Sequence, residues 1–163
     1  MERILVIGSN GAGKSTFSVA LAQKTGFPLT HIDKLYWRDN WEITPKDEFE
    51  SAVMRIAQGD KWIIEGNNLR SLGQRLEFAD TVFWFSFPPA KCMWNVIKRE
   101  VQFWGRPRPG MAEKCVNRLT WRFLKDVWRF NRKNRSRIEQ ALADAPQVRV
   151  IRIRNYKQLG QYL

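Results

Sequence analysis

The sequence predicts an α/β fold built on a parallel β-sheet, and three observations lead to it. Short apolar runs that suit buried strands alternate along the chain with stretches of helical periodicity. A glycine-rich turn, residues 8–13, joins the first such run to the first helical stretch. No internal repeat or linker divides the 163 residues. We therefore expect residues 1–163 to form a single domain in which right-handed crossovers connect the strands.

The expected strands are rich in β-branched, aliphatic and aromatic residues and end at turn-forming residues. They cover residues 3–7, 29–32, 62–64, 81–87 and 148–154. The first is a continuous apolar run, typical of a strand buried on both faces. The last alternates in polarity, which favours a place at the edge of the sheet.

The expected helices are placed by apolar spacing and by start and stop signals. They cover residues 14–24, a segment after Pro45, residues 69–78, a segment from Pro89, and residues 112–143 with a break near 131–136. A short helix ends the chain. In the helix after Pro89 we expect Met93, Ile97, Val101 and Trp104 to share one face.

Residues 8–15 read GSNGAGKS and satisfy the phosphate-binding pattern G-x-x-x-x-G-K-[ST]. Glycines let the backbone wrap around phosphate oxygens, and the helix that follows adds the positive end of its dipole. Lys14 is expected to reach the β and γ phosphates, Ser15 to ligate Mg²⁺ and Thr16 to bond the α-phosphate. The residues expected to bind nucleotide are Gly8, Asn10, Gly11, Ala12, Gly13, Lys14, Ser15 and Thr16.

Two carboxylates follow expected strands and would face the same crevice as the glycine-rich turn. Glu65 is interpreted as holding a water on Mg²⁺, and Asp33 as orienting or deprotonating an acceptor hydroxyl. Asn67 and Arg70 come shortly after Glu65 and are candidate acceptor contacts. Simpler interpretations stay open: Asp33 as a turn cap and Glu65 as the partner of a basic neighbour.

Positive charge is concentrated in one part of the chain. The formal net charge is +12, of which residues 91–137 carry +11. Within this stretch, Arg99, Arg106 and Arg108 flank a proline-containing loop, where arginines can stabilise a transferring phosphate. A basic stripe at helical spacing follows: Lys114, Arg118, Arg122, Lys125, Arg129 and Arg132. Such a stripe is either a solvated face or a surface for a nucleic-acid backbone.

Several classes of protein are excluded or disfavoured by residue content. Cys92, Cys115 and His31 are too few for a closed Cys/His zinc site, and two cysteines suit a reducing compartment. No run approaches the roughly 20 apolar residues of a membrane span, so we expect a cytoplasmic protein with no membrane partner. The aromatic loop 36–41 is interpreted either as cover for the sheet edge or as a clamp for an acceptor.

The segments GSNGAGKST, HIDKLYW, WIIEGNN, RLEFADTVFWFSFP and RPRPGMAE, in this order, resemble the DNA topology modulation protein family. That family is similar to adenylate and shikimate kinases among the P-loop kinases. The resemblance implies a three-layer P-loop NTPase fold with five parallel strands in the order 2-3-1-4-5. It also implies ATP and Mg²⁺ as ligands, an acceptor-side segment near 36–60 and a lid near 100–112. Arg99 resembles a lid arginine, whereas Asn95 stands where nucleotide kinases tend to have a base-stacking arginine.

These features give one leading functional hypothesis and two others. The first is a kinase that transfers the γ-phosphoryl group of ATP-Mg²⁺ to a small-molecule acceptor, either a nucleotide or a hydroxylated metabolite, with Lys14, Asp33, Arg99 and Arg106 as catalytic residues. The second is a nucleotide-dependent DNA-binding regulator that uses the basic helix 112–137. The third is an ATPase switch without an acceptor.

Overall fold

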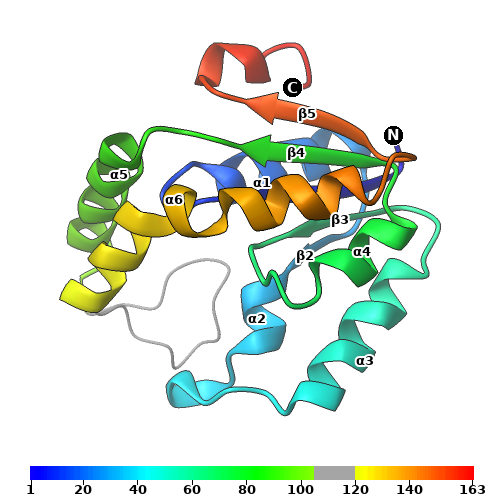
Figure 1. Ribbon diagram of the computed structural model, residues 1–163, viewed down its shortest axis with the longest axis horizontal. Coiled ribbons are helices and arrows are strands. Elements are labelled where there is room, and N and C mark those ends of the chain that lie inside the picture. The colour runs from blue at the N-terminus through cyan, green and yellow to red at the C-terminus, as the bar shows by residue number, and fades with distance from the viewer. Residues whose placement is uncertain (105–119) are drawn as a thin grey trace.

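The computed structural model describes residues 1–104 and 120–163, and within them five strands form one parallel sheet (Figure 1). The strands are β1 (Arg3–Gly8), β2 (Leu29–His31), β3 (Trp62–Glu65), β4 (Thr81–Phe85) and β5 (Arg149–Ile153). Their order is β2-β3-β1-β4-β5, so the predicted order is confirmed and β5 is an edge strand as expected. Because all neighbours are parallel, the carboxyl ends of the strands meet at one edge of the sheet.

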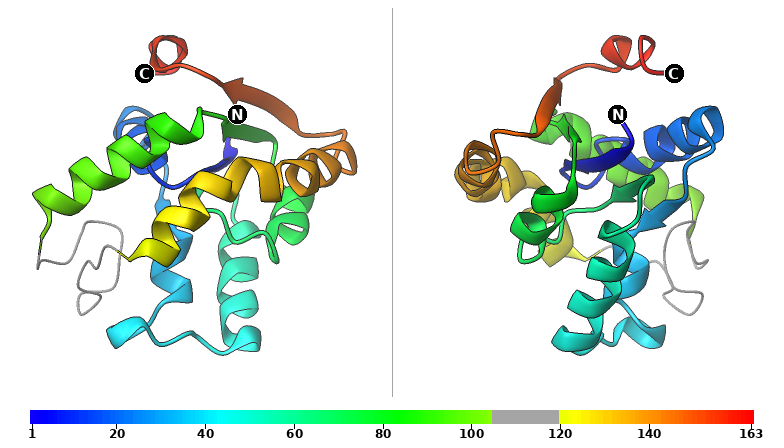
Figure 2. Two further views of the ribbon diagram at one scale, coloured as in Figure 1. Left: turned by 60° about the vertical axis from the view of Figure 1, so that its left-hand side comes forward. Right: turned by 90° about the vertical axis from the view of Figure 1, so that its right-hand side faces the viewer.

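Helices cover both faces of the sheet, which gives the predicted three layers. α1 (Lys14–Thr25) and α5 (Pro89–Gln102) pack on one face, and α3 (Lys46–Ala57) and α4 (Leu72–Phe78) pack on the other. α6 (Trp121–Ala143) reaches both cores, the first through Val127 and the second through Ile138, and Figure 2 shows α1 and α6 on opposite sides of the sheet. Among the described residues, no helix has both the length and the apolar character needed to cross a membrane.

The alternation of strand residues explains the two cores. Along β1, Ile4 and Val6 point into the core shared with α1, whereas Leu5 and Ile7 point into the core shared with α3 and α4. All four side chains are fully buried. A strand buried on both faces has no polar face, and this is why it reads as a continuous apolar run in the sequence.

Two predictions about the helices are wrong. α6 runs unbroken from Trp121 to Ala143, because its polar middle contains no glycine or proline and the side chain of Asn131 donates to the carbonyl oxygen of Phe87 at 2.7 Å. α5 ends at Gln102, so Trp104 lies beyond the helix, where it is 74% exposed; of the other residues expected to share its face, Met93 and Ile97 are half-buried and Val101 is 69% exposed. Cys92 and Val96 point inward instead, toward the glycine-rich loop.

The segment after β2 also differs from the expectation. The strand ends at His31, and α2 (Ile32–Tyr36) begins at once, so Asp33 lies in a helix and not at the strand end. A short 3₁₀ turn, η1 (Asp39–Trp41), follows where an aromatic loop was expected. A second 3₁₀ turn, η2 (Tyr156–Leu159), lies where the short terminal helix was expected.

Candidate functional site

The glycine-rich loop lies between the end of β1 and the first turn of α1, at the carboxyl edge of the sheet. Its backbone takes left-handed values at Gly11 (φ 78°) and Gly13 (φ 88°), which ordinary side chains rarely adopt. A Cβ on Gly11 would come within 2.2 Å of the Cys92 carbonyl oxygen. The loop therefore has its shape only because glycine stands at these positions.

Lys14 folds back over this loop. Its ammonium group donates to the carbonyl oxygen of Ser9 at 3.1 Å and lies 3.7 Å from Oε1 of Glu65. The side chain is almost fully buried. A buried ammonium on a rigid loop is a fixed positive charge, and the attraction of the partner carboxylate offsets the free-energy cost of its burial.

Glu65 connects the loop to the neighbouring strands. Its Oε2 accepts a hydrogen bond from the hydroxyl of Ser15 at 3.2 Å and lies 2.7 Å from Nδ1 of His31, its neighbour in the register of β2 and β3. Burial alone would raise the pKa of Glu65, but the hydrogen bond with His31 and the charge of Lys14 outweigh it. The pKa of Glu65 is therefore lowered, and the group is a carboxylate at neutral pH.

The structure thus brings together the two residues expected to bind metal, Ser15 and Glu65, with Lys14 beside them. Hydroxyl and carboxylate oxygens form a hard donor set that suits Mg²⁺, which is held in proteins by one or two side chains and completed by water and phosphate. Within residues 1–104 and 120–163, no group of three His, Cys, Asp or Glu side chains could hold a metal ion. The donor set fits Mg²⁺ better than a zinc site.

Asn67 and Arg75 fix the loop that follows β3. The side-chain oxygen of Asn67 accepts from the backbone N–H of Gly8 at 2.8 Å, so this residue braces the glycine-rich loop. The guanidinium of Arg75 is completely buried and donates to three backbone carbonyls, those of Gly66, Asn68 and Ser71. Burial lowers the pKa of Arg75 to about 10, and the charge of Asp33 opposes this shift.

A second brace comes from the opposite side of the loop. The Asn95 side-chain amide donates to the carbonyl oxygen of Gly11 at 2.8 Å and to the Tyr156 hydroxyl at 3.0 Å. The Tyr156 ring lies beside Gly13, and the ammonium of Lys91 lies 4.4 Å from its centroid. Asn95 stands where nucleotide kinases tend to have an arginine, and its side chain here helps to hold the glycine-rich loop in its conformation.

The remaining predicted residues lie elsewhere or fall outside the description. Arg70 is exposed, and its backbone N–H donates to Oδ1 of Asn68. Arg99 lies in the last turn of α5, where Nη2 is 3.2 Å from Oε1 of the buried Glu100. Arg106, Arg108 and the lid residues 105–112 lie outside the described residues. In the basic stripe, Arg122, Lys125, Arg129 and Arg132 are exposed on α6, and Lys114 and Arg118 are not described.

From the sequence, His31 was considered only in excluding a zinc site, and Arg75 and Tyr156 were not considered. His31 occupies the carboxyl end of β2, the same positional signal that pointed to Asp33, and a strand boundary one residue shorter would have revealed it. Arg75 and Tyr156 carry no such local signal, because their partners are set by the packing of α4 and η2.

Comparison with known proteins identifies solved structures with a similar fold. No family model matches the sequence, and no curated protein matches it. Two solved structures are similar: a proposed kinase from Chloroflexus aurantiacus (TM-score 0.50, 19% identity, 78% of each chain covered) and an unliganded sugar kinase from Janibacter sp. (TM-score 0.53, 13% identity, 99% of this chain and 91% of that chain).

The fold is the predicted three-layer α/β fold of P-loop NTPase type, with five parallel strands, and these two structures share it. No family model supports the resemblance to the topology modulation proteins. The solved structures support only the P-loop kinase-like fold that this resemblance implied. At identities below 20%, the structural similarity establishes the fold, and the activity has to be argued from the residues of the site.

Proposed function

We propose that this chain is a small-molecule kinase that transfers the γ-phosphoryl group of ATP to an acceptor. The observation that carries the proposal is the cluster at the first turn of α1. There a glycine-rich loop, the buried ammonium of Lys14, the Ser15 hydroxyl and the Glu65 carboxylate lie within hydrogen-bonding or ion-pair distance of one another. Phosphoryl transfer needs positioning and charge neutralisation more than covalent chemistry, and this cluster provides both.

Each residue of the cluster has a distinct role in the proposal. The backbone of residues 8–13 and the start of α1 hold the phosphates, Lys14 contacts the β and γ phosphates, and Thr16 contacts the α-phosphate. Ser15 ligates Mg²⁺, and Glu65 holds a water of its shell. The bound ion would neutralise charge on the β and γ oxygens.

The acceptor side is assigned in this proposal to residues near 36–60, and Asp33, Asn67 and Arg70 are proposed to contact the acceptor. Asp33 would orient or deprotonate the acceptor hydroxyl, and its charge acts on the buried guanidinium of Arg75. Arg99 and Arg106 belong to a segment near 100–112 that would close over the phosphates. All residues of the chain belong, in this proposal, to one kinase-like domain. The DNA-binding alternative receives no support from the structures that this chain resembles.

The test is Lys14→Ala, which removes the only charge that lies directly over the loop among the described side chains in contact with it. We expect ATP turnover to be lost while the far-UV circular dichroism spectrum keeps its folded shape, with a lower melting temperature because the buried Glu65 loses its ion-pair partner. Lys24→Ala is the matched control, because Lys24 lies on the same helix, is exposed and contacts only the chain terminus through the Tyr162 carbonyl oxygen. Undiminished turnover in Lys14→Ala would contradict the proposal.

A further inference from the structure

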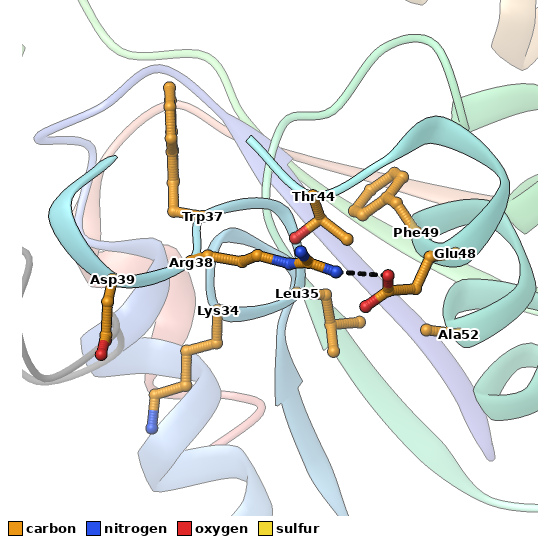
Figure 3. A pocket seen from close by; sticks show the side chains of 9 residues that line it. All are labelled: Lys34, Leu35, Trp37, Arg38, Asp39, Thr44, Glu48, Phe49 and Ala52. Carbon is orange, nitrogen blue, oxygen red and sulfur yellow. Dashed lines mark hydrogen bonds and ion pairs between the residues drawn. The ribbon is translucent and has the colours of Figure 1, made fainter. Parts of the chain in front are cut away.

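A cavity of about 390 Å³ lies apart from the glycine-rich loop, between α2, the segment that follows it and α3 (Figure 3). Its volume is within the range of small-ligand sites, about 300–1,000 Å³. Leu35, Phe49 and Ala52 supply apolar surface, and the aromatic side chain of Trp37 also lines the cavity. The cavity is thus large enough for one small ring compound and has an apolar surface on which a ring can pack.

Backbone hydrogen bonds hold the walls of this cavity in place. The N–H of Arg38 donates to the carbonyl oxygen of Glu42 at 2.8 Å, and the N–H of Thr44 donates to that of Tyr36 at 2.9 Å. Between these bonds the backbone is left-handed at Trp41 (φ 65°), an unfavourable conformation for a large aromatic residue. The Trp41 ring packs against Trp37 at 5.5 Å. The cavity is therefore part of the fold and does not need a ligand to form.

The charged groups that line the cavity balance one another. Lys34 and Arg38 supply two positive charges, and Asp39 and Glu48 supply two negative ones. Figure 3 shows Arg38 reaching across to Glu48, to which its Nη2 donates a hydrogen bond. A phosphorylated ligand needs an excess of cationic donors and would meet two carboxylates here. An uncharged ligand with hydroxyl groups finds carboxylate acceptors, cationic donors and the Thr44 hydroxyl instead.

The cavity is connected to the proposed reaction centre by a single short helix. α2 begins directly after His31, whose Nδ1 is 2.7 Å from Glu65, and it supplies Lys34 and Leu35 to the cavity. Five helical residues rise about 7 Å, which is the span of a small ring compound with its substituents. Asp33 lies between the two places on this same helix.

We propose that this cavity binds the acceptor and that the acceptor is an uncharged hydroxylated ring compound, sugar-like or nucleoside-like, and not a phosphorylated one. The inference rests on the proposed kinase function and narrows it, because a nucleotide monophosphate is then excluded as the acceptor. The ring packs on Trp37 and the apolar floor, and the reacting hydroxyl points toward Asp33. In the transfer the hydroxyl oxygen bonds to the γ-phosphorus, the bond to the β–γ bridging oxygen breaks, the hydroxyl proton goes to Asp33, and ADP leaves.

The first experiment measures ADP formation by the full chain with ATP and Mg²⁺ and a panel of acceptors. The panel contains monosaccharides and nucleosides, each paired with its own monophosphate. We expect at least one uncharged compound to stimulate ATP consumption and its monophosphate to have a kcat/KM lower by about tenfold or more. Which half of the panel responds distinguishes a sugar from a nucleoside.

Two variants test whether this cavity is the binding place. Ala52→Leu fills it without removing a polar group, and we expect a rise in acceptor KM of about tenfold or more with an unchanged KM for ATP. Ser51→Leu, an exposed neighbour on α3 that does not line the cavity, is the matched control and is expected to change neither. Glu48→Gln removes one carboxylate and releases Arg38, so the preference is expected to move several-fold toward phosphorylated compounds.

The contrary results fall into two groups, those against the inferred acceptor and those against the proposed function. Preference of the wild type for phosphorylated acceptors, an unchanged acceptor KM in Ala52→Leu, or ATP turnover that no uncharged compound stimulates would each overturn the inference and leave the kinase fold and the ATP site standing. Full ATP turnover in Lys14→Ala would instead overturn the proposed function itself.

Discussion

Replacing Gly11 with alanine tests the geometry of the glycine-rich loop most directly. The added Cβ would lie 2.2 Å from the carbonyl oxygen of Cys92 and 2.9 Å from a methyl carbon of Val96, and both atoms belong to α5. The first contact is with backbone, so no side-chain rotation relieves it. The residue also has φ 78°, where an alanine is itself strained.

The two effects can be separated with glycines elsewhere in the chain. Gly26 is left-handed (φ 71°), but a Cβ added there would meet no atom within 4 Å, so Gly26→Ala carries only the conformational cost of about 1–2 kcal/mol. Gly73 lies within α4 with open space around it, so Gly73→Ala is expected to be neutral or to stabilise by up to about 1 kcal/mol. Gly11→Ala carries the same conformational cost and the overlap with α5 in addition.

Thermal unfolding and nucleotide affinity are the measurements. For a chain of this size about 1 kcal/mol corresponds to a melting shift of about 2–4 °C, so Gly26→Ala is expected to lose about 2–8 °C and Gly11→Ala clearly more. Binding of an ATP analogue should be lost only in Gly11→Ala. Equal melting temperatures for the two variants, together with retained nucleotide binding in Gly11→Ala, would refute the close approach of the loop to α5.

Two further predictions concern stability. The pKa of Asp80 is lowered although burial alone would raise it, because the hydroxyl of Thr81 and the N–H groups of Glu2 and Arg3 donate to its carboxylate. The ionised form therefore stabilises the fold above the unfolded pKa, and this contribution is lost as the pH falls through the folded pKa. Asp80→Asn is expected to cost about 1 kcal/mol at pH 7. In urea titrations its free energy of unfolding should converge with that of the wild type between about pH 5 and pH 2. Arg75→Met leaves three backbone carbonyls, two of them in buried residues, without their donor and is expected to cost about 3 kcal/mol or more. Arg70→Met, on the loop that Arg75 braces, should stay within about 0.5 kcal/mol.

The sheet could be predicted because its signals are local. β1 is buried on both faces and reads as an apolar run. β5 lies at the edge of the sheet, and its residues run from exposed at Arg149 and Val150 to buried at Ile153. The faces of α5 could not be predicted in the same way. Val101 is apolar yet exposed, and Glu100 is charged yet buried, so the face predicted from hydrophobic periodicity is displaced by one residue from the buried one.

The candidate site was predictable to the extent that it depends on strand ends. Ser15 and Glu65 were expected near one another and are 3.2 Å apart, 50 residues distant in the chain. The braces of the loop were not predicted, because the partners of Gly8 and Gly11 come from segments 59 and 84 residues away. Glycine and asparagine in these segments look like ordinary turn or helix residues, and only the packing of α5 and of the loop after β3 gives them their roles.

Both braces are uncharged carboxamides, and their neutrality has a consequence for the proposed phosphate site. Asn67→Asp keeps an oxygen that accepts the hydrogen bond from Gly8, and a charged acceptor makes that bond stronger, so stability should be unchanged or slightly higher. The same change places a negative charge against the loop that would hold the phosphates. Repulsion on the order of 1.4–2.8 kcal/mol is expected, which weakens ATP binding by about ten- to a hundredfold and is relieved by salt. Binding measured by calorimetry at two salt concentrations, beside the melting temperature, separates the two effects. If Asn67→Asp binds ATP as tightly as the wild type, the loop is not where the phosphates lie; if it unfolds, the hydrogen bond to Gly8 is not the contact that Asn67 provides.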